Sequence, residues 1–175
     1  MAKSASASNE EKLAKRLKKF KNDPYHFVVY AFDWGRGDLE GETGPDIWQE
    51  AFLKDLGGKL EQGFETALRY ATASGHGIGK SCLTAWIILW AMTTRPHLNG
   101  VITANTSTQL ETKTWRELAI WHKRLINMHW FTWRATKFYQ KDHPETWYVS
   151  PIPWREEKSE AFAGTHGKAV LMIYD

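Results

Sequence analysis

The sequence contains very little cysteine and no apolar run long enough to span a bilayer. Its single cysteine, Cys82, excludes an internal disulfide, which is typical of proteins in a reducing compartment. The longest apolar run, Ala85–Met92, is far shorter than the roughly 20 residues of a transmembrane helix. The opening residues, MAKSASASNEEK, lack the apolar segment of a secretory signal. We therefore expect a cytoplasmic protein with no membrane contact.

Residue patterns for a structural zinc site and for a catalytic triad are also missing. The chain has 7 histidines, but no His-x₃₋₅-His pair stands beside a second pair of zinc ligands. The order of its serines, histidines and aspartates gives no defensible Ser-His-Asp arrangement either. We expect neither a structural zinc ion nor triad chemistry.

Length and composition indicate one globular domain. The 175 residues are 42% hydrophobic and 25% charged, enough to bury a core and unlike a disordered chain. The net charge of +3 is too small to indicate nucleic acid by itself. The excess of basic residues lies between Glu10 and Asp23. This segment could contact DNA or an acidic partner, but we favour a solvated face of an amphipathic helix. Most of the 10 tryptophans are expected in packing, with base stacking the less favoured interpretation.

The first forty residues are predicted to form an arm (1–40) separate from the main domain (41–175). A loop rich in glycine and acidic residues, 35–45, marks the boundary. Within the arm we expect a mobile polar stretch Met1–Asn9, a helix Glu10–Asn22 capped by Asn9, and a strand or buried extended segment Tyr25–Phe32.

Strands and helices alternate in the rest of the chain, which predicts an α/β fold with a mostly parallel sheet. Leu110, Thr114, Leu118, Trp121 and Leu125 are spaced to line the inward face of one long helix, which two capping boxes begin. The expected helices are a segment from Asp46 to Gly57-Gly58, Ser81–Met92 and Ser107–Asn127. The expected strands are Ala67–Ala71, Val101–Ala104, a hairpin of Trp133–Tyr139 and Thr146–Ile152, and Ala169–Tyr174. A charged turn or short helix is expected at Glu156–Glu160.

A glycine-rich segment, Ala73–Ser81 (ASGHGIGKS), has the composition of a phosphate-binding loop. Its three glycines allow successive backbone N–H groups to face an anion, and the helix expected after it adds partial positive charge. Lys80 would reach the β- and γ-phosphates, and the Ser81 hydroxyl would bind Mg²⁺. The full pattern G-x-x-x-x-G-K-[ST] has glycine where this chain has Ser74; the alternative is a glycine-rich turn followed by a chance Lys-Ser. The predicted binding residues are Ser74, Gly75, His76, Gly77, Ile78, Gly79, Lys80 and Ser81.

Three further segments carry polar groups that suit a nucleotide site. Asp175 follows the apolar run Ala169–Tyr174, which we expect to be a strand buried on both faces, so its carboxylate would emerge at the ligand-binding edge of a parallel sheet. There it could hold Mg²⁺ through water, opposite Ser81. The Gln49 amide could read an adenine edge, although a surface helix Gln is more common. The polar strand end Thr103–Thr106 either contacts nucleic acid, senses the γ-phosphate or simply caps the next helix.

These segments together resemble the ATPase half of the large terminase subunit of tailed bacteriophages. The residues that carry the resemblance are ASGHGIGKS, VITANTSTQLETKTWRELAIW and EAFAGTHGKAVLMIYD, in this order and spacing, with PDIWQEAF similar to the family's adenine-binding Gln segment. The resemblance covers residues 44–175.

The resemblance implies a three-layer P-loop NTPase fold of the additional-strand class, truncated after the acid-bearing strand. An extra strand separates the loop strand from the acid-bearing strand in this class, and Val101–Ala104 lies between them in sequence. It also implies ATP and Mg²⁺ as cofactors, with Lys80 and Asp175 catalytic, Ser81 and Asp175 at the metal and Gln49 at adenine. The implied partners are double-stranded DNA, a small terminase subunit and a portal protein, with the full-length motor a homo-oligomeric ring in the host cytoplasm.

Three departures from the family pattern modify these expectations. The family's catalytic Glu would be the residue after Asp175, the C-terminal nuclease domain is absent, and His76 stands where some members carry an Arg. We therefore expect an N-terminal fragment or truncated gene product that binds ATP weakly and hydrolyses it very slowly. The alternatives are a helicase-like DNA ATPase, a small-molecule phosphotransferase and a non-catalytic remnant that binds a partner.

Overall fold

The computed structural model describes residues 2–63, 67–73, 75, 77–153 and 168–175. Its centre is a five-stranded sheet in the order β2-β3-β4-β1-β5. β1 (Leu98–Thr103) pairs in parallel with β4 (Tyr148–Pro151) on one side and with β5 (Ala169–Tyr174) on the other. β3 (Lys137–Gln140) pairs antiparallel with both β2 (Phe131–Arg134) and β4. The α/β class is confirmed, but the sheet is mixed rather than mostly parallel.

The mixed sheet results from a break in a segment predicted as one strand. Trp133–Tyr139 is interrupted after Arg134, so β2 and β3 form their own hairpin. The expected pairing across the turn at Asp142 is also present, between β3 and β4. Three consecutive strands therefore form an antiparallel meander beside the parallel pair β1 and β5.

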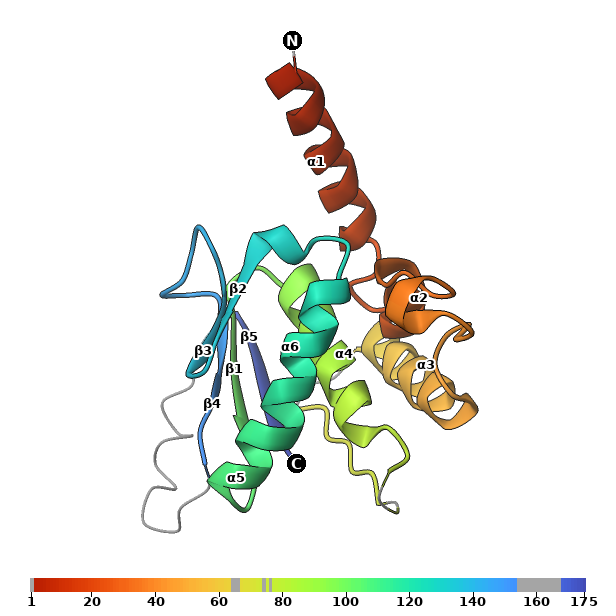
Figure 1. Cartoon of the computed structure of the whole chain (residues 1–175), viewed down its shortest axis with the longest axis vertical. Coiled ribbons are helices and arrows are strands. Elements are labelled where there is room, and N and C mark those ends of the chain that lie inside the picture. Colours follow the sequence, from red (N-terminus) through yellow and green to blue (C-terminus); the bar gives the residue numbers. More distant parts are fainter. Residues whose placement is uncertain (1, 64–66, 74, 76, 154–167) are drawn as a thin grey trace.

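Two helices cover one face of this sheet. α4 (Lys80–Thr94) and α6 (Arg116–Arg124) pack against each other across it, and Figure 1 shows α2 (Pro24–Ala31) and α3 (Ile47–Gln62) on the far side of α4. α1 (Ala2–Lys18) projects from the body of the molecule. The predicted α4 is confirmed within two residues at each end, because its apolar sequence is buried on nearly every side.

The predicted long helix Ser107–Asn127 is three consecutive segments. A short α-helix α5 (Ser107–Gln109) leads into a π-helical turn η2 (Leu110–Trp115) and then into α6. The Thr106 hydroxyl accepts a hydrogen bond from the backbone N–H of Gln109 at 3.1 Å, as the first capping box predicts. The inward face is confirmed, since its five predicted members are at most 5% exposed.

The N-terminal predictions were wrong in two places. Tyr25–Ala31 is helical and only Phe32 is extended, because Pro24 occupies the first turn of α2 and the Asp23 carboxylate accepts from the backbone N–H of His26 at 3.1 Å. Residues from Ala2 onward are already helical, so Met1–Asn9 is not a separate polar stretch and Asn9 is not a cap. Two short 3₁₀ turns, η1 (Gly37–Leu39) and η3 (Met128–Trp130), complete the described elements.

Ala67–Ala71 is not a strand. The segment has no regular structure and runs along α3, where the Tyr70 hydroxyl donates to the Asp55 carboxylate at 2.8 Å and its ring lies 5.1 Å from that of Phe52. β1 therefore does not separate this segment from β5, contrary to the arrangement expected for the additional-strand class. Glu156–Glu160 lies outside the described residues.

β5 is not buried on both faces either. Its side chains alternate, with Val170 47%, Met172 41% and Tyr174 66% exposed, while Leu171 and Ile173 pack against the core. Parallel strands are usually covered on both faces. Here the helices cover one face of β5, and the second helical layer of a three-layer fold is not seen in the described part of the chain.

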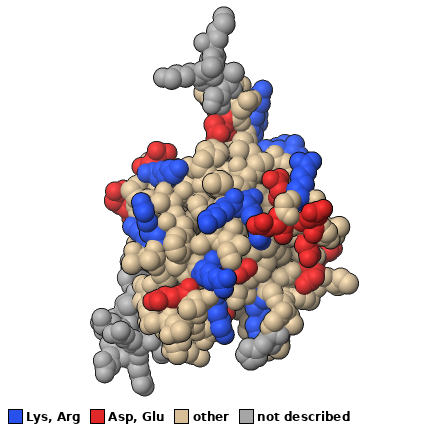
Figure 2. Space-filling model, viewed as in Figure 1, with Lys and Arg blue, Asp and Glu red and all other residues tan. Residues whose placement is uncertain are grey.

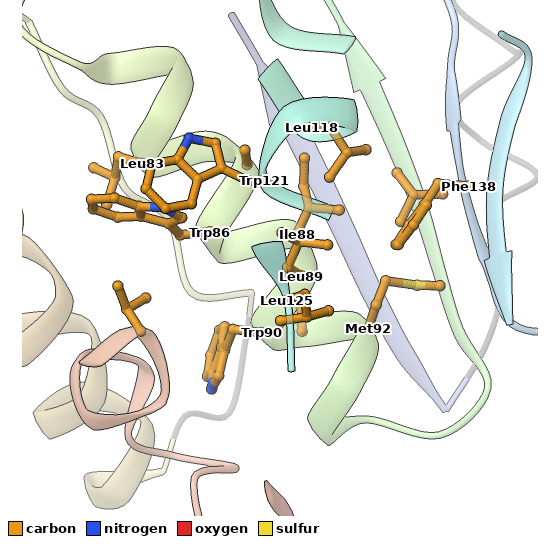
Figure 3. Packing of buried hydrophobic residues seen from close by; sticks show 14 of the residues in the cluster. Leu83, Trp86, Ile88, Leu89, Trp90, Met92, Leu118, Trp121, Leu125 and Phe138 are labelled. Carbon is orange, nitrogen blue, oxygen red and sulfur yellow. The ribbon is translucent and has the colours of Figure 1, made fainter. Parts of the chain in front are cut away.

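The core centres on α4 and a group of aromatic rings. Trp86 lies 5.0 Å from Trp121, 5.7 Å from Trp34 and 6.5 Å from Phe32, measured between ring centroids. Figure 3 shows Trp86 and Trp121 on the helical side of this core and Phe138 on the sheet. Most tryptophans thus pack, as the composition predicts, and α2 shares this core with α4.

Gly57 and Gly58 do not end α3, which continues to Gln62. A Cβ on Gly57 would lie 2.9 Å from the backbone oxygen of Asn22, so this glycine permits close packing, whereas a Cβ on Gly58 meets nothing within 4 Å. Gly57→Ala is expected to destabilise the protein by about 1 kcal/mol through overpacking. Gly58→Ala should stabilise it by about 0.5–1 kcal/mol, because alanine favours the helix. Urea unfolding of both variants checks the pair; equal effects would contradict the packing role of Gly57.

Candidate nucleotide-binding site

The glycine-rich loop ends at a left-handed glycine directly before a helix. Gly77 and Gly79 have φ of +80° and +84°, a region that side-chain-bearing residues rarely occupy. Gly79 is the N-cap of α4, and Lys80 is the first helical residue. The first backbone N–H groups of a helix have no partner within it, so the loop places donors and partial positive charge at its open end. Ser74 and His76 lie outside the described residues.

Gln49 is the residue outside the loop that holds it. Its side-chain oxygen accepts from the backbone N–H of Asp46 at 2.9 Å, and its Nε2 donates to the carbonyl of Gly79 at 3.1 Å. The first bond belongs to a capping box at the start of α3. The side-chain amide of Gln49 therefore bonds to both the start of α3 and the loop. Each amide atom keeps capacity for one more hydrogen bond, although the residue is only 4% exposed.

Lys80 folds back across the loop. Its Nζ donates to the carbonyl of Gly75 at 3.1 Å, which spans the loop from its helical end to its beginning. Ser81, the second residue of α4, is half-buried, and Ile78 is 37% exposed at the tip. Gln49 and the described loop residues 75 and 77–81 therefore lie together.

A second group of polar residues gathers at the carboxyl ends of β1 and β5. The backbone N–H of Asp175 donates to the carbonyl of Thr103 at 2.9 Å, which continues the pairing of the two strands. The Thr114 hydroxyl donates to the Asp175 carboxylate. A pocket of about 170 Å³ opens beside them and is lined by Thr103, Ala104, Asn105, Tyr174 and Asp175.

The Thr103 hydroxyl is buried and has no hydrogen-bond partner among the described residues, and the residue is only 2% exposed. A buried hydroxyl without a partner is costly, and water or a polar ligand normally supplies one. The pocket is roomy enough for several waters. Among the residues that line the pocket, Asp175 is the one with a charged side chain.

The described residues thus form two half-sites. One is the loop with Gln49; the other is the Asp175 pocket, whose lining includes none of the described loop residues. α4, which begins at the loop, packs against β5, which ends at Asp175, so one helix connects them.

The two residues predicted to hold Mg²⁺ lie in different places, Ser81 at the start of α4 and Asp175 in the pocket at the end of β5. Ser81 offers a hydroxyl and Asp175 a carboxylate, and Mg²⁺ is usually held by one or two carboxylates together with substrate phosphates and waters. Among the described residues, no group of three or more His, Cys, Asp and Glu side chains is placed to hold a metal. Phosphate oxygens would therefore have to complete the coordination.

Thr114 was predicted from the sequence only as a core residue, but its hydroxyl bonds to Asp175. The available signal was a polar residue in the middle of an otherwise apolar helix face.

Cys82, one residue beyond Ser81, carries a buried thiol. Burial raises the pKa of this thiol, and nearby Glu117 adds to the effect. The thiol is therefore protonated and unreactive near neutral pH.

Comparison with known proteins gives no match to a family model, a curated protein or a solved structure. The described residues contain no helix with the length and apolar character needed to cross a membrane.

Proposed function

We propose that this chain is the ATP-binding part of a terminase large subunit, a motor that drives double-stranded DNA into a procapsid. The observation that carries the proposal is the loop: left-handed Gly79 directly before α4, Lys80 drawn back over it, and Gln49 bonded to its carbonyl. Glycines in this conformation before a helix N-terminus favour a backbone phosphate cradle, and Lys80 and Gln49 lie against it.

In this proposal each residue has a defined task. The loop N–H groups and the start of α4 bind the phosphates, and Lys80 exchanges its bond to the Gly75 carbonyl for one to a phosphate oxygen. Bound Mg²⁺ neutralises phosphate charge. Ser81 and Asp175 would hold that ion from two sides, and Gln49 would use its remaining hydrogen-bonding capacity for adenine.

The DNA partner is supported by the basic residues of α1. Lys15, Arg16 and Lys18 lie in its last turn, exposed at the end where the helix joins the body (Figure 1), and a duplex could reach them there. On the face seen in Figure 2, basic and acidic side chains are interspersed elsewhere. Binding of the small terminase subunit and the portal protein, and assembly into a ring, rest on the sequence resemblance alone.

A helicase-like ATPase is the second candidate, and one observation favours it. The polar strand end Thr103 and Asn105 lines the same pocket as Asp175, so a contact there with a single strand would lie directly beside the metal site. In the helicase-like protein, nucleic acid would occupy the Asp175 pocket, where the packaging proposal places hydrated Mg²⁺.

The affinity of the chain for duplex and single-stranded DNA separates these proposals. Fluorescence anisotropy of a labelled 30-base-pair duplex and its single strand would be measured with and without Mg²⁺ and a non-hydrolysable ATP analogue. The packaging proposal predicts that the nucleotide strengthens duplex binding about fivefold or more, within the usual range of coupling between sites. Strengthening of single-strand binding alone would favour the helicase-like protein, and no effect on either would contradict both.

A further inference from the structure

Thr114 is a fully buried polar residue whose hydroxyl reaches the proposed metal ligand. It is 0% exposed, and it donates a hydrogen bond to the carboxylate of Asp175, 61 residues later in the chain. A threonine in a helix can satisfy its hydroxyl on the carbonyl four residues earlier, as Thr112 does with Thr108 at 2.6 Å. Thr114 instead bonds across to the sheet.

The π-helical turn η2 is the element that presents Thr114 to the sheet edge. Leu110 and Trp115, at its two ends, are 0% and 2% exposed, and the Trp115 indole N–H donates to the carbonyl of Arg134 at 2.8 Å. The turn is therefore fixed on the β2–β3 hairpin. Single π-helical turns inside α-helices are rare and often lie at functional sites.

Asp175 is held both at its backbone and at its side chain as a result. Its backbone N–H is bonded to Thr103 at 2.9 Å, and one side-chain oxygen accepts from Thr114. A carboxylate has about four acceptor positions, so a single hydroxyl donor restricts its orientation and leaves most of them available. The pocket that Asp175 lines together with Asn105 and Tyr174 lies beside it.

We propose that Thr114 is a positioning residue that orients the Asp175 carboxylate toward a Mg²⁺-bound nucleotide. This role rests on the proposed function of the loop and of Asp175. The competing explanation is a purely structural tie between η2 and β5. The two differ in one respect: a structural tie affects stability, whereas a positioning bond also changes how much Mg²⁺ is needed for nucleotide binding.

The test is the Mg²⁺ concentration at half-maximal binding of a fluorescent ATP analogue. Thr114→Val keeps the shape and removes the hydroxyl, Thr114→Ser keeps the hydroxyl, and Thr112→Val removes an exposed hydroxyl from the same turn. Loss of an outer-shell partner typically weakens metal affinity about 10–100-fold, so Thr114→Val should raise the midpoint about tenfold. Thr114→Ser and Thr112→Val should change it less than about twofold, and Thr114→Val should add little when Asp175→Asn is already present.

The outcomes separate this inference from the function on which it rests. If the unmodified chain binds the analogue with the same affinity at every Mg²⁺ concentration, the metal role of Asp175 is wrong, and the role of Thr114 is wrong with it. If binding requires Mg²⁺ but Thr114→Val and Thr112→Val have equal midpoints, the loop proposal stands and the positioning role is overturned. Thermal unfolding of each variant, measured alongside, shows whether the bond contributes only to stability.

Discussion

Trp86→Ala is expected to lower the free energy of unfolding by about 3–5 kcal/mol, the usual cost of removing a buried aromatic side chain. Trp86 is 2% exposed on α4, and its ring contacts Trp34 and Trp121 on two other parts of the chain. Its removal would leave a cavity where Trp34, α4 and α6 meet, and Figure 3 shows its ring beside that of Trp121. Since many domains are stable by only about 5–15 kcal/mol, much of the variant could be unfolded near 37 °C.

Urea unfolding followed by circular dichroism measures this loss. The matched control is Ile47→Ala, because Ile47 is apolar and helical but 89% exposed, and its change should stay within about 0.5 kcal/mol. Trp86→Phe is informative as well. The indole N–H of Trp86 has no partner among the described residues, so phenylalanine loses ring area without losing a hydrogen bond. A cost for Trp86→Ala below about 1.5 kcal/mol would contradict the assignment of Trp86 to the centre of the core.

Gly79→Ala is expected to impair both stability and nucleotide binding. A left-handed backbone costs a side-chain-bearing residue about 1–2 kcal/mol, and here φ is +84°. A Cβ at this position would also lie 2.8 Å from Nε2 of Gln49, the atom that holds the loop. The loop would have to shift at the start of α4, where phosphate binding is proposed.

The control for this prediction is Gly75→Ala in the same loop. A Cβ on Gly75 meets nothing within 4 Å, and its φ is not in the left-handed region. We expect Gly75→Ala to retain nucleotide affinity within about threefold. Gly79→Ala should lower nucleotide affinity about tenfold or more, because relief of the backbone strain distorts the loop that binds the phosphates. Equal affinities for the two variants, measured with a fluorescent nucleotide, would show that the conformation of Gly79 is not required.

The helix after the loop and its connection to Gln49 show what local patterns can predict. α4 was predictable because a glycine precedes a long apolar run, which leaves few alternatives. Proximity of Gln49 to the loop followed from a resemblance of sequence segments, but the bond to Gly79 and the capping box that shares the same amide depend on how α3 packs. Packing of this kind is a tertiary property that spacing does not encode.

The errors have physical causes that differ from one segment to the next. Tyr25–Phe32 has the composition of a strand, yet the Asp23-Pro24 start signal and burial against α4 favour a helix. Gly57-Gly58 resembles a helix end, yet a glycine inside a helix also allows another backbone to approach. In both cases a tertiary contact outweighed the local preference.

The largest difference concerns Ala67–Ala71, because the fold expected from the resemblance needs it in the sheet. Its side chains contact α3 instead, through Tyr70 and Asp55. The expected order places Ala67–Ala71 beside β1, on the side opposite β5, and β4 occupies that position instead. The position of Asp175 at the carboxyl end of a strand was predicted from the apolar run, whereas the placement of β1 beside β5 was implied only by the resemblance.

The most direct test of the central claim is equilibrium binding of a fluorescent ATP analogue, with Mg²⁺, to the unmodified chain and to Lys80→Ala. A hydrogen bond from a charged group contributes about 1.5–3 kcal/mol, so the account predicts that Lys80→Ala lowers affinity at least about tenfold. Lys54→Ala removes an exposed lysine that pairs with Glu50 on α3, and it should leave affinity unchanged. If Lys80→Ala binds as tightly as the unmodified chain, residues 73–81 are not a phosphate-binding loop.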